Sequence, residues 1–177
     1  YRGLLIEKEL NELSKIKTSP NQPFTVIVGG SKIASKIIML SYFLGKADNI
    51  IVGGGMAFPF IKALGGEVGG SLCAENEVAL ASSFIAQSKH VKTNFILPDD
   101  AVVADSITNY QFVKTVDIRR IPSDYMGLDI GPKSIEKFGG IIDKSKSLLW
   151  NGPMGVFEQK DFSAGTFTIA QKIAERK

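Results

Sequence analysis

The feature that most constrains the fold of this chain is a repeated pattern in which a short apolar run stops at glycine. The runs at 24–28 and 50–52 are followed by glycine pairs or triplets, and the run at 148–150 is followed by Asn-Gly. A run that is apolar on both faces is typical of a buried parallel strand. Helical spacing of apolar residues at 33–44 and 78–85 lies between these runs. Strand and helix therefore alternate along the chain.

This alternation predicts an α/β fold: a doubly wound, mostly parallel sheet with helices on both faces, a Rossmann-like three-layer sandwich. Further strands are expected at 95–97 and 128–130, short strands or a hairpin at 101–104 and 113–118, and helices at 133–143 and 164–175. Ligands of such sheets bind beyond the carboxyl ends of the strands, where the strand order reverses. The glycine clusters are expected at that edge.

Length and composition bound the class of protein. A chain of 177 residues suggests one domain, and its start at Tyr1 leads us to expect a piece of a longer protein. A net charge of +3 is too small and scattered for a nucleic-acid-binding face. No uncharged stretch exceeds the fourteen residues of 18–31, so no membrane span is expected. A single cysteine and a single histidine exclude an internal disulfide and a Cys/His metal cluster, which favours a reducing, cytoplasmic location.

The first candidate site begins at Gly29-Gly30, where a strand ends and a helix is expected to start. Free backbone N–H groups and the helix dipole would favour an anion there. Lys32 and Lys36 are four residues apart, so on one helix face they would suit a polyphosphate. The alternative is two solvated lysines on an ordinary surface helix. The segment is not a Walker A loop, because it lacks Gly-Lys-Ser/Thr.

Two further loops are candidates. Residues 53–58 suggest a dinucleotide fingerprint, but Phe58 occupies the third glycine position. The glycines could let a flat ring approach the backbone, or could simply form a tight turn. In the loop 150–158, Glu158 could accept hydrogen bonds from the two ribose hydroxyls, or the loop could be a structural turn. Asp99, Asp100 and Asp105 are more typical of turns than of a metal site, so no metal ligand is assigned.

Taken together, these motifs resemble the C-terminal, nucleotide-binding half of phosphoglycerate kinases over essentially the whole chain. The matching segments, in the family's order and spacing, are Val28–Lys32 with Lys36, Ile51–Ala57, Gly66–Gly69, Leu97-Pro98, Met126–Pro132 and Trp150–Glu158. Ser31, Tyr125 and Pro59 depart from the family, which usually has alanine, tryptophan and no proline there. The resemblance implies an interdomain helix or linker at 1–16 and a nucleotide-binding domain at 17–177, incomplete at its C-terminus.

The resemblance also implies an activity: transfer of a phosphoryl group between 1,3-bisphosphoglycerate and ADP, giving 3-phosphoglycerate and ATP, in glycolysis and with Mg²⁺. By the family pattern Lys36 is catalytic and follows the transferred phosphoryl group, and Lys32 follows the inner phosphates. The pattern also implies that Glu158 holds the ribose. The phosphate path would be lined by Gly29, Gly30 and Asn151, and the adenine would be framed by Gly53, Gly54, Leu72, Gly127 and Pro153. The carboxylate acceptor is ionised at neutral pH, so the reaction needs positioning and charge stabilisation but no general base.

Other parts of the family pattern lie outside this sequence. The arginine cluster that binds 3-phosphoglycerate belongs to the family's N-terminal domain, and the aspartate that serves Mg–nucleotide belongs to a later Gly-Gly-Gly-Asp loop. We therefore expect the chain alone to bind nucleotide weakly and to be inactive, and the full-length family member to be monomeric. The alternative is a non-catalytic, Rossmann-like module that binds a nucleotide or another cofactor.

Overall fold

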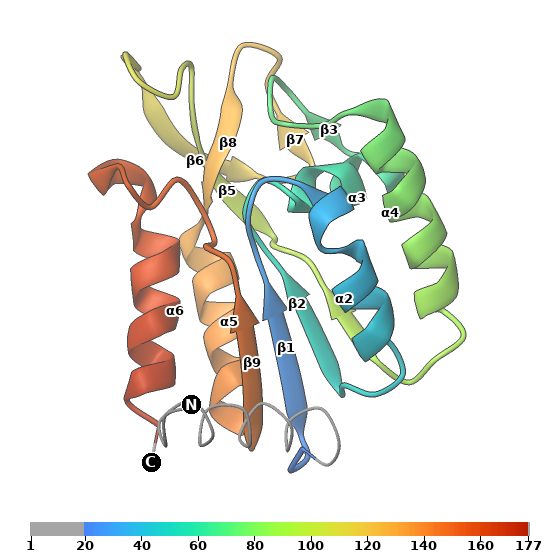
Figure 1. Cartoon of the computed structure of the whole chain (residues 1–177). Coiled ribbons are helices and arrows are strands. Elements are labelled where there is room, and N and C mark those ends of the chain that lie inside the picture. The colour runs from blue at the N-terminus through green and yellow to red at the C-terminus, as the bar shows by residue number, and fades with distance from the viewer. Residues whose placement is uncertain (1–19, 177) are drawn as a thin grey trace, which may run out of the picture.

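Four parallel strands form the central sheet of the computed structural model, which describes residues 20–176 (Figure 1). These strands are β1 (Phe24–Val28), β2 (Asn49–Val52), β4 (Asn94–Ile96) and β9 (Ser147–Asn151), in the order β4-β2-β1-β9. The chain adds β2 and β4 on one side of β1 and later adds β9 on the other. The strand order therefore reverses between β1 and β9, which is where doubly wound sheets bind ligands.

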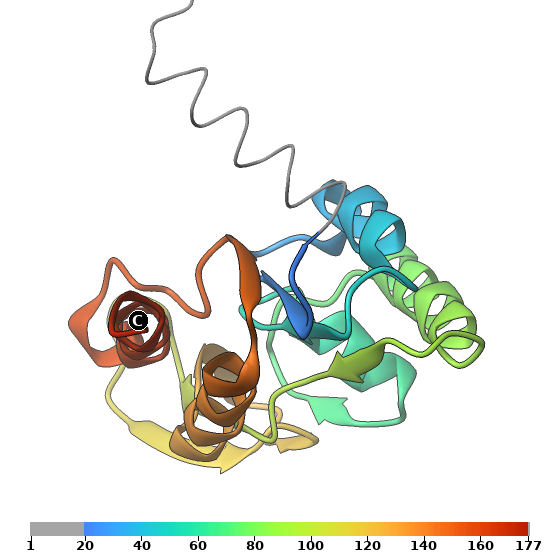
Figure 2. The same ribbon diagram turned by 90° about the horizontal axis from the view of Figure 1, so that it is seen from below.

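Helices cover both faces of this sheet (Figures 1 and 2). On one face lie α2 (Ile37–Phe43), α3 (Ala57–Ala63) and α4 (Glu75–Ser88), and on the other lie α5 (Pro132–Lys144) and α6 (Ala164–Ala174). Neighbouring residues of β1 face opposite layers: Val26 packs with α2 and α3, whereas Ile27 packs with α5 and α6. Because both faces are buried, the strands are apolar throughout. The predicted three-layer α/β fold is confirmed.

A second, antiparallel sheet lies beyond the carboxyl ends of the central strands (Figure 1). It has the order β6-β5-β8, with β5 at Asp100–Ala104, β6 at Val113–Asp117 and β8 at Met126–Ile130. The hairpin expected at 101–104 and 113–118 is thus present. The strand at 128–130 pairs with β5 of this hairpin and not with the parallel sheet, because strand pairing is decided by contacts far apart in the chain, which a short segment does not reveal. A short parallel pair, β3 (Glu67–Val68) with β7 (Arg120–Ile121), completes this part.

Two short 3₁₀ helices flank the edge where the strands end. They are η1 (Ile33–Ser35), which precedes α2, and η2 (Lys160–Phe162), which precedes α6. The interdomain helix or linker expected at 1–16 and its boundary with the expected domain lie outside the described residues. None of the helices in the described part has the length and apolarity needed to cross a membrane.

Candidate functional site

The loops that follow β1, β2 and β9 are joined by backbone hydrogen bonds. The Gly29 N–H donates to the Asn151 carbonyl at 2.8 Å, and the Gly30 N–H donates to the Pro153 carbonyl at 2.9 Å. The Gly54 N–H donates to the Met154 carbonyl at 3.0 Å. Of the free N–H groups expected at the start of this segment, those of Gly29 and Gly30 are therefore not available to an anion. Their N–H groups fasten the first glycine loop to the loop after β9.

Glycine is required where these loops approach each other. Gly54 has a φ of +66°, and a Cβ at this position would lie 2.7 Å from the Gly30 oxygen and 2.9 Å from the Pro153 oxygen. Gly53 is equally confined, because a Cβ there would lie 2.5 Å from the sulfur of Met154. The tight-turn interpretation of this segment thus holds for its structure. Phe58 is buried against Gly127, where a Cβ would overlap the phenyl ring.

The two candidate lysines do not share a face of one α-helix. Lys32 has extended backbone (φ −126°, ψ 122°) and precedes η1, while Lys36 lies at the junction of η1 and α2. The chain turns at Gly30 and then winds as a 3₁₀ helix, so a spacing of four does not stack the side chains as it would in an α-helix. The expected double-lysine face is wrong. Lys36 instead donates from Nζ to Oδ1 of Asn151 at 2.5 Å, across the reversal between β1 and β9.

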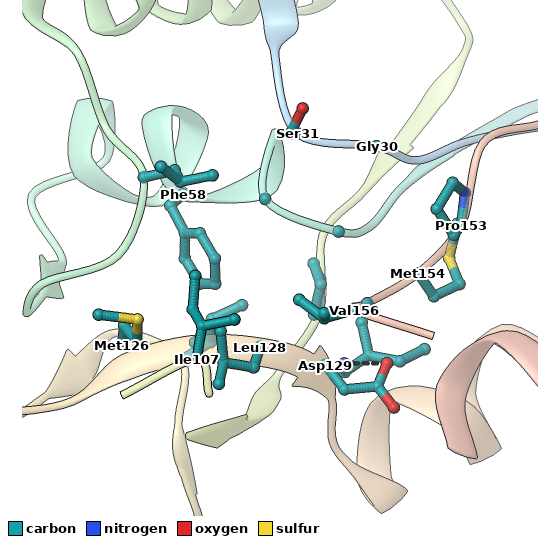
Figure 3. Close-up of a pocket in the computed structure, with 18 of the residues that line it drawn as sticks. Gly30, Ser31, Phe58, Ile107, Met126, Leu128, Asp129, Pro153, Met154 and Val156 are labelled. Atoms are coloured by element: carbon teal, nitrogen blue, oxygen red, sulfur yellow. Dashed lines mark hydrogen bonds between the residues drawn. The ribbon is translucent and has the colours of Figure 1, made fainter. Parts of the chain in front are cut away.

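A cavity of about 440 Å³ lies between this edge of the parallel sheet and the antiparallel sheet (Figure 3). Six of the predicted site residues line it: Gly30, Gly54, Leu72, Gly127, Pro153 and Glu158. The other five, which are not among the lining residues, are Gly29, Lys32, Lys36, Gly53 and Asn151. Of these, Gly29 and Gly53 are buried and donate backbone hydrogen bonds to the carbonyls of Asn151 and Val28, and Lys36 and Asn151 form a hydrogen-bonded pair. Lys32 is exposed.

The walls of the cavity are largely apolar, and of the apolar side chains that form them only Leu72 and Pro153 were assigned to the site from the sequence. Figure 3 shows Phe58 and Met126 on one side, Met154 and Pro153 on the other, and Leu128 below on β8. An apolar slot with a few polar groups at its margin suits a flat ring with a polar attachment. Phe58 could have been found from its position three residues after the glycine triplet. Within β8 the family resemblance implied Gly127 alone, and local pattern gave no signal for Met126 or Leu128.

Asp129 is a buried carboxylate beside the cavity, with 4% of its surface exposed. Its oxygens accept hydrogen bonds from the Ile130 N–H at 2.9 Å and from the Gly165 N–H, at the start of α6, at 2.7 Å. Burial raises the pKa of this carboxyl to about 6, although both N–H donors act to lower it. Gly155 leaves the space that Asp129 fills, because a Cβ on Gly155 would lie 2.7 Å from the Asp129 Cα. Its sequence signal is a charged residue in the middle of an otherwise apolar strand.

Glu158 and Leu72 lie at the margin of the cavity, where their side chains are exposed. Glu158 follows Val156, whose N–H donates to the Leu128 carbonyl at 2.8 Å and so attaches this loop to β8. An exposed carboxylate at the end of an apolar slot can accept hydrogen bonds from a ligand that enters the slot. This placement is compatible with the expected ribose contact.

The acidic residues considered for a metal have other partners. Asp100 accepts the N–H groups of Lys133 (3.1 Å) and Ser134 (2.9 Å) at the start of α5. Asp105 accepts backbone N–H groups within its own loop, and Asp99 forms an ion pair with Lys137 at 2.8 Å. Among residues 20–176 no group of three or more His, Cys, Asp or Glu side chains is arranged to hold a metal ion.

Comparisons with known proteins agree with this arrangement. The family model described as phosphoglycerate kinase matches residues 1–177. The solved structure of phosphoglycerate kinase from Coxiella burnetii superposes with a TM-score of 0.93 and is 34% identical, covering 99% of this chain and 45% of that one. Phosphoglycerate kinase from Pyrococcus horikoshii OT3 gives a TM-score of 0.76 at 27% identity, covering 98% of this chain and 44% of that one.

The chain thus spans less than half the length of the solved structures that it matches. The match covers the segments that build the glycine edge and the cavity, from the loop after β1 to the loop after β9. The family model and the solved structures lead to one identification: this chain belongs to the phosphoglycerate kinase family.

Proposed function

We propose that this chain binds ADP and ATP and forms the nucleotide-binding part of a phosphoglycerate kinase. The observation that carries the proposal is the position of the cavity. It is an apolar slot that ends at the glycine loops where the strand order reverses, and Lys36 lies just beyond those loops. A base in the slot would place the phosphates over Gly30 and toward Lys36 and Asn151.

The geometry suggests separate tasks for the residues of the site. The slot beside Phe58 and Leu128 would hold the adenine by burial, and Glu158 at the margin would hold the ribose. Lys36 is already held by Asn151 Oδ1, so its ammonium group is oriented before a phosphate arrives. A positioned ammonium group stabilises the charge that spreads over a phosphoryl group in transfer. We therefore keep Lys36 as the candidate catalytic residue.

Lys32 has a weaker structural case. It is exposed, follows the loop after β1 and is not among the residues that line the cavity. A long, flexible lysine at this place can still reach the inner phosphates of a bound nucleotide. We propose a binding role for Lys32 and a role in the transfer step for Lys36.

The proposed reaction moves a phosphoryl group from the acyl phosphate of 1,3-bisphosphoglycerate to ADP, and the reverse direction forms the acyl phosphate from ATP. The carboxylate of 3-phosphoglycerate is a nucleophile that needs no base at neutral pH. A Mg²⁺ ion bound to the nucleotide phosphates would neutralise part of their charge. The acceptor would be bound by a further part of the family's longer chains, and the cytoplasm remains our expected location.

Calorimetric titration with ADP tests this proposal, with Glu158→Ala as the informative variant. We expect weak, measurable binding, and we expect Glu158→Ala to weaken ADP by about tenfold or more, because a hydrogen bond to a charged group contributes about 1.5–3 kcal/mol. The variant should weaken 2′,3′-dideoxy-ADP much less, since that nucleotide has no ribose hydroxyls to bind.

Glu136→Ala is the matched control, because Glu136 is an exposed glutamate on α5, away from the cavity lining. It should leave the affinity for both nucleotides unchanged. Absence of binding at millimolar ADP would refute the nucleotide site. Equal weakening of the two nucleotides by Glu158→Ala would refute only the ribose contact.

A further inference from the structure

A tyrosine joins two segments that both contribute residues to the cavity lining. Tyr110 belongs to the loop 105–112 that connects β5 to β6, and its hydroxyl donates to Oδ2 of Asp161 at 2.8 Å. Asp161 belongs to η2, which follows the loop after β9. The two residues are 51 positions apart in the sequence, so this contact is a tertiary one.

The ring of Tyr110 is fixed as well as its hydroxyl. It packs edge to face on Phe162 with ring centroids 5.0 Å apart, and Phe162 is fully buried. Phe162 in turn belongs to a small core with Leu128 of β8, against which Val156 also packs. The aromatic contact therefore anchors the tyrosine on the same core that supports one wall of the cavity.

The loop that carries Tyr110 is also closed internally. Oδ1 of Asp105 accepts the N–H groups of Gln111 at 3.0 Å and Phe112 at 3.3 Å, which ties the two ends of the loop together. The side chain of Ile107, from the same loop, lines the cavity (Figure 3). A loop closed in this way moves as a unit, so its attachment at Tyr110 sets where Ile107 lies.

The segment on the other side of the contact carries the ribose candidate. Val156 and Glu158 line the cavity and precede η2 by a few residues. The hydrogen bond between Tyr110 and Asp161 thus connects the loop of Ile107 to the segment of Glu158. The hydrogen bond to Asp161 also raises the pKa of the Tyr110 hydroxyl, because the carboxylate favours the protonated, donating form of the phenol.

We propose that Tyr110 is a positioning residue that fastens the loop 105–112 to η2 and thereby fixes the spacing of Ile107 and Glu158 across the cavity. This inference rests on the proposed nucleotide site, because its consequence is the retention of the nucleotide. When the hydrogen bond between Tyr110 and Asp161 is formed, the side chain of Ile107 stays against the bound base. Without this bond the loop moves away and the nucleotide leaves faster.

The test combines hydrogen exchange of the free protein with stopped-flow measurement of ADP release, followed through Trp150. This is the single tryptophan of the chain, and its indole N–H donates to the Gly152 carbonyl beside the cavity loop. Tyr110→Phe removes the hydroxyl and keeps the ring, and Asp161→Ala removes the acceptor. Each should speed ADP release about threefold to tenfold, the effect expected from the loss of one hydrogen bond.

Three further variants separate this role from a general loss of structure. The double variant Tyr110→Phe/Asp161→Ala should release ADP no faster than either single variant, because both remove the same bond. Asp161→Asn keeps an oxygen acceptor and should retain most of the slow release. Tyr42→Phe is the matched control, since Tyr42 is an exposed tyrosine on α2 whose partner is Lys46.

The two measurements distinguish the ways in which the inference can fail. The inference is supported if amide exchange at Gln111 and Phe112 and the release of ADP both rise in Tyr110→Phe. Faster exchange with unchanged release would overturn the positioning role, and unchanged exchange would overturn the fastening itself. If the unsubstituted chain binds no ADP, the proposed function fails and the positioning role fails with it. Amide hydrogen exchange in Tyr110→Phe would still show whether the hydrogen bond to Asp161 holds the loop 105–112.

Discussion

At the scale of single residues, Asp129 is the most unusual group of the site. Its carboxylate is buried against Gly155 and Gly165, and its hydrogen-bond partners are backbone N–H groups. A buried carboxylate costs folding free energy in its ionised form, and the two backbone N–H donors offset part of that cost. The two glycines explain how β8, the loop after β9 and α6 can all approach this one side chain.

The raised pKa of Asp129 predicts a specific dependence of stability on pH. The pKa in the folded state is about 6, above its ordinary value of 3.8. The contribution of this group to folding is therefore fully present below pH 3.8 and is lost as the pH rises through about 6. A shift of about two units corresponds to a loss on the order of 3 kcal/mol.

Urea unfolding of the unsubstituted chain and of Asp129→Asn at several pH values measures this loss. The variant does not titrate at this position, so the stability of the unsubstituted chain relative to the variant should fall between about pH 4 and pH 7. A difference in stability that stays constant across this range would show that the carboxyl of Asp129 titrates in its ordinary range.

Sequence reasoning reached some of these residues and missed others for a physical reason. Gly30, Gly54 and Pro153 follow predicted strands, so their place at the edge of the sheet could be predicted locally. The burial of Asp129 depends on Gly155 and on Gly165, which contact it only after folding. Local pattern cannot reveal such long-range contacts.

At the scale of the elements, the three glycine loops form one unit. Their backbones approach so closely that side chains are excluded, and hydrogen bonds from Gly29, Gly30 and Gly54 connect them. The consequence is a rigid edge on which a ligand can rest without rearrangement of the loops. The phosphate region is thus preorganised by packing of backbone on backbone, and the N–H groups of Gly29, Gly30 and Gly54 serve to join the loops.

Gly54→Ala should therefore be strongly destabilising. The positive φ of +66° disfavours alanine, and the added Cβ would meet the backbone of Gly30 at 2.7 Å. We expect the free energy of unfolding in urea to fall by about 2–4 kcal/mol. Nucleotide affinity should fall with it, because the edge would have to open to admit the methyl group.

Gly140→Ala is the matched control for this substitution. Gly140 lies in α5, and a Cβ there would meet no atom within 4 Å. Alanine is the better helix former, so this variant should gain about 0.5–1 kcal/mol of stability. Equal effects of the two substitutions on stability would show that the loops have room that the structure does not provide.

The elements themselves were predicted with uneven success. The strands and the long helices followed from apolar runs and helical spacing, as β1, α5 and α6 illustrate. The start of the helix after Gly30 was wrong, because apolar spacing of three and four residues is shared by a 3₁₀ turn followed by an α-helix. That error is what misplaced Lys32 relative to Lys36.

At the scale of the whole molecule, the cavity lies between two sheets of different kinds. The parallel sheet contributes loops, which are glycine-rich and rigid, and the antiparallel sheet contributes the apolar wall around Leu128. The sequence predicted the first sheet and its edge but not that β8 would join a separate sheet, since strand pairing is decided by contacts far apart in the chain. The resemblance to a known family supplied the site residues that the pattern alone left open.

The central claim is that nucleotide binds between these two sheets, and a titration of the ¹⁵N-labelled chain with ADP tests it most directly. The amide signals of Gly30, Gly54 and Gly127, which line the cavity, should shift on binding, while those of Gly139 and Gly140 in α5 should not. The contradictory result would be shifts confined to α5 and to the polar recess around Lys144 and Lys172, with the cavity glycines unchanged.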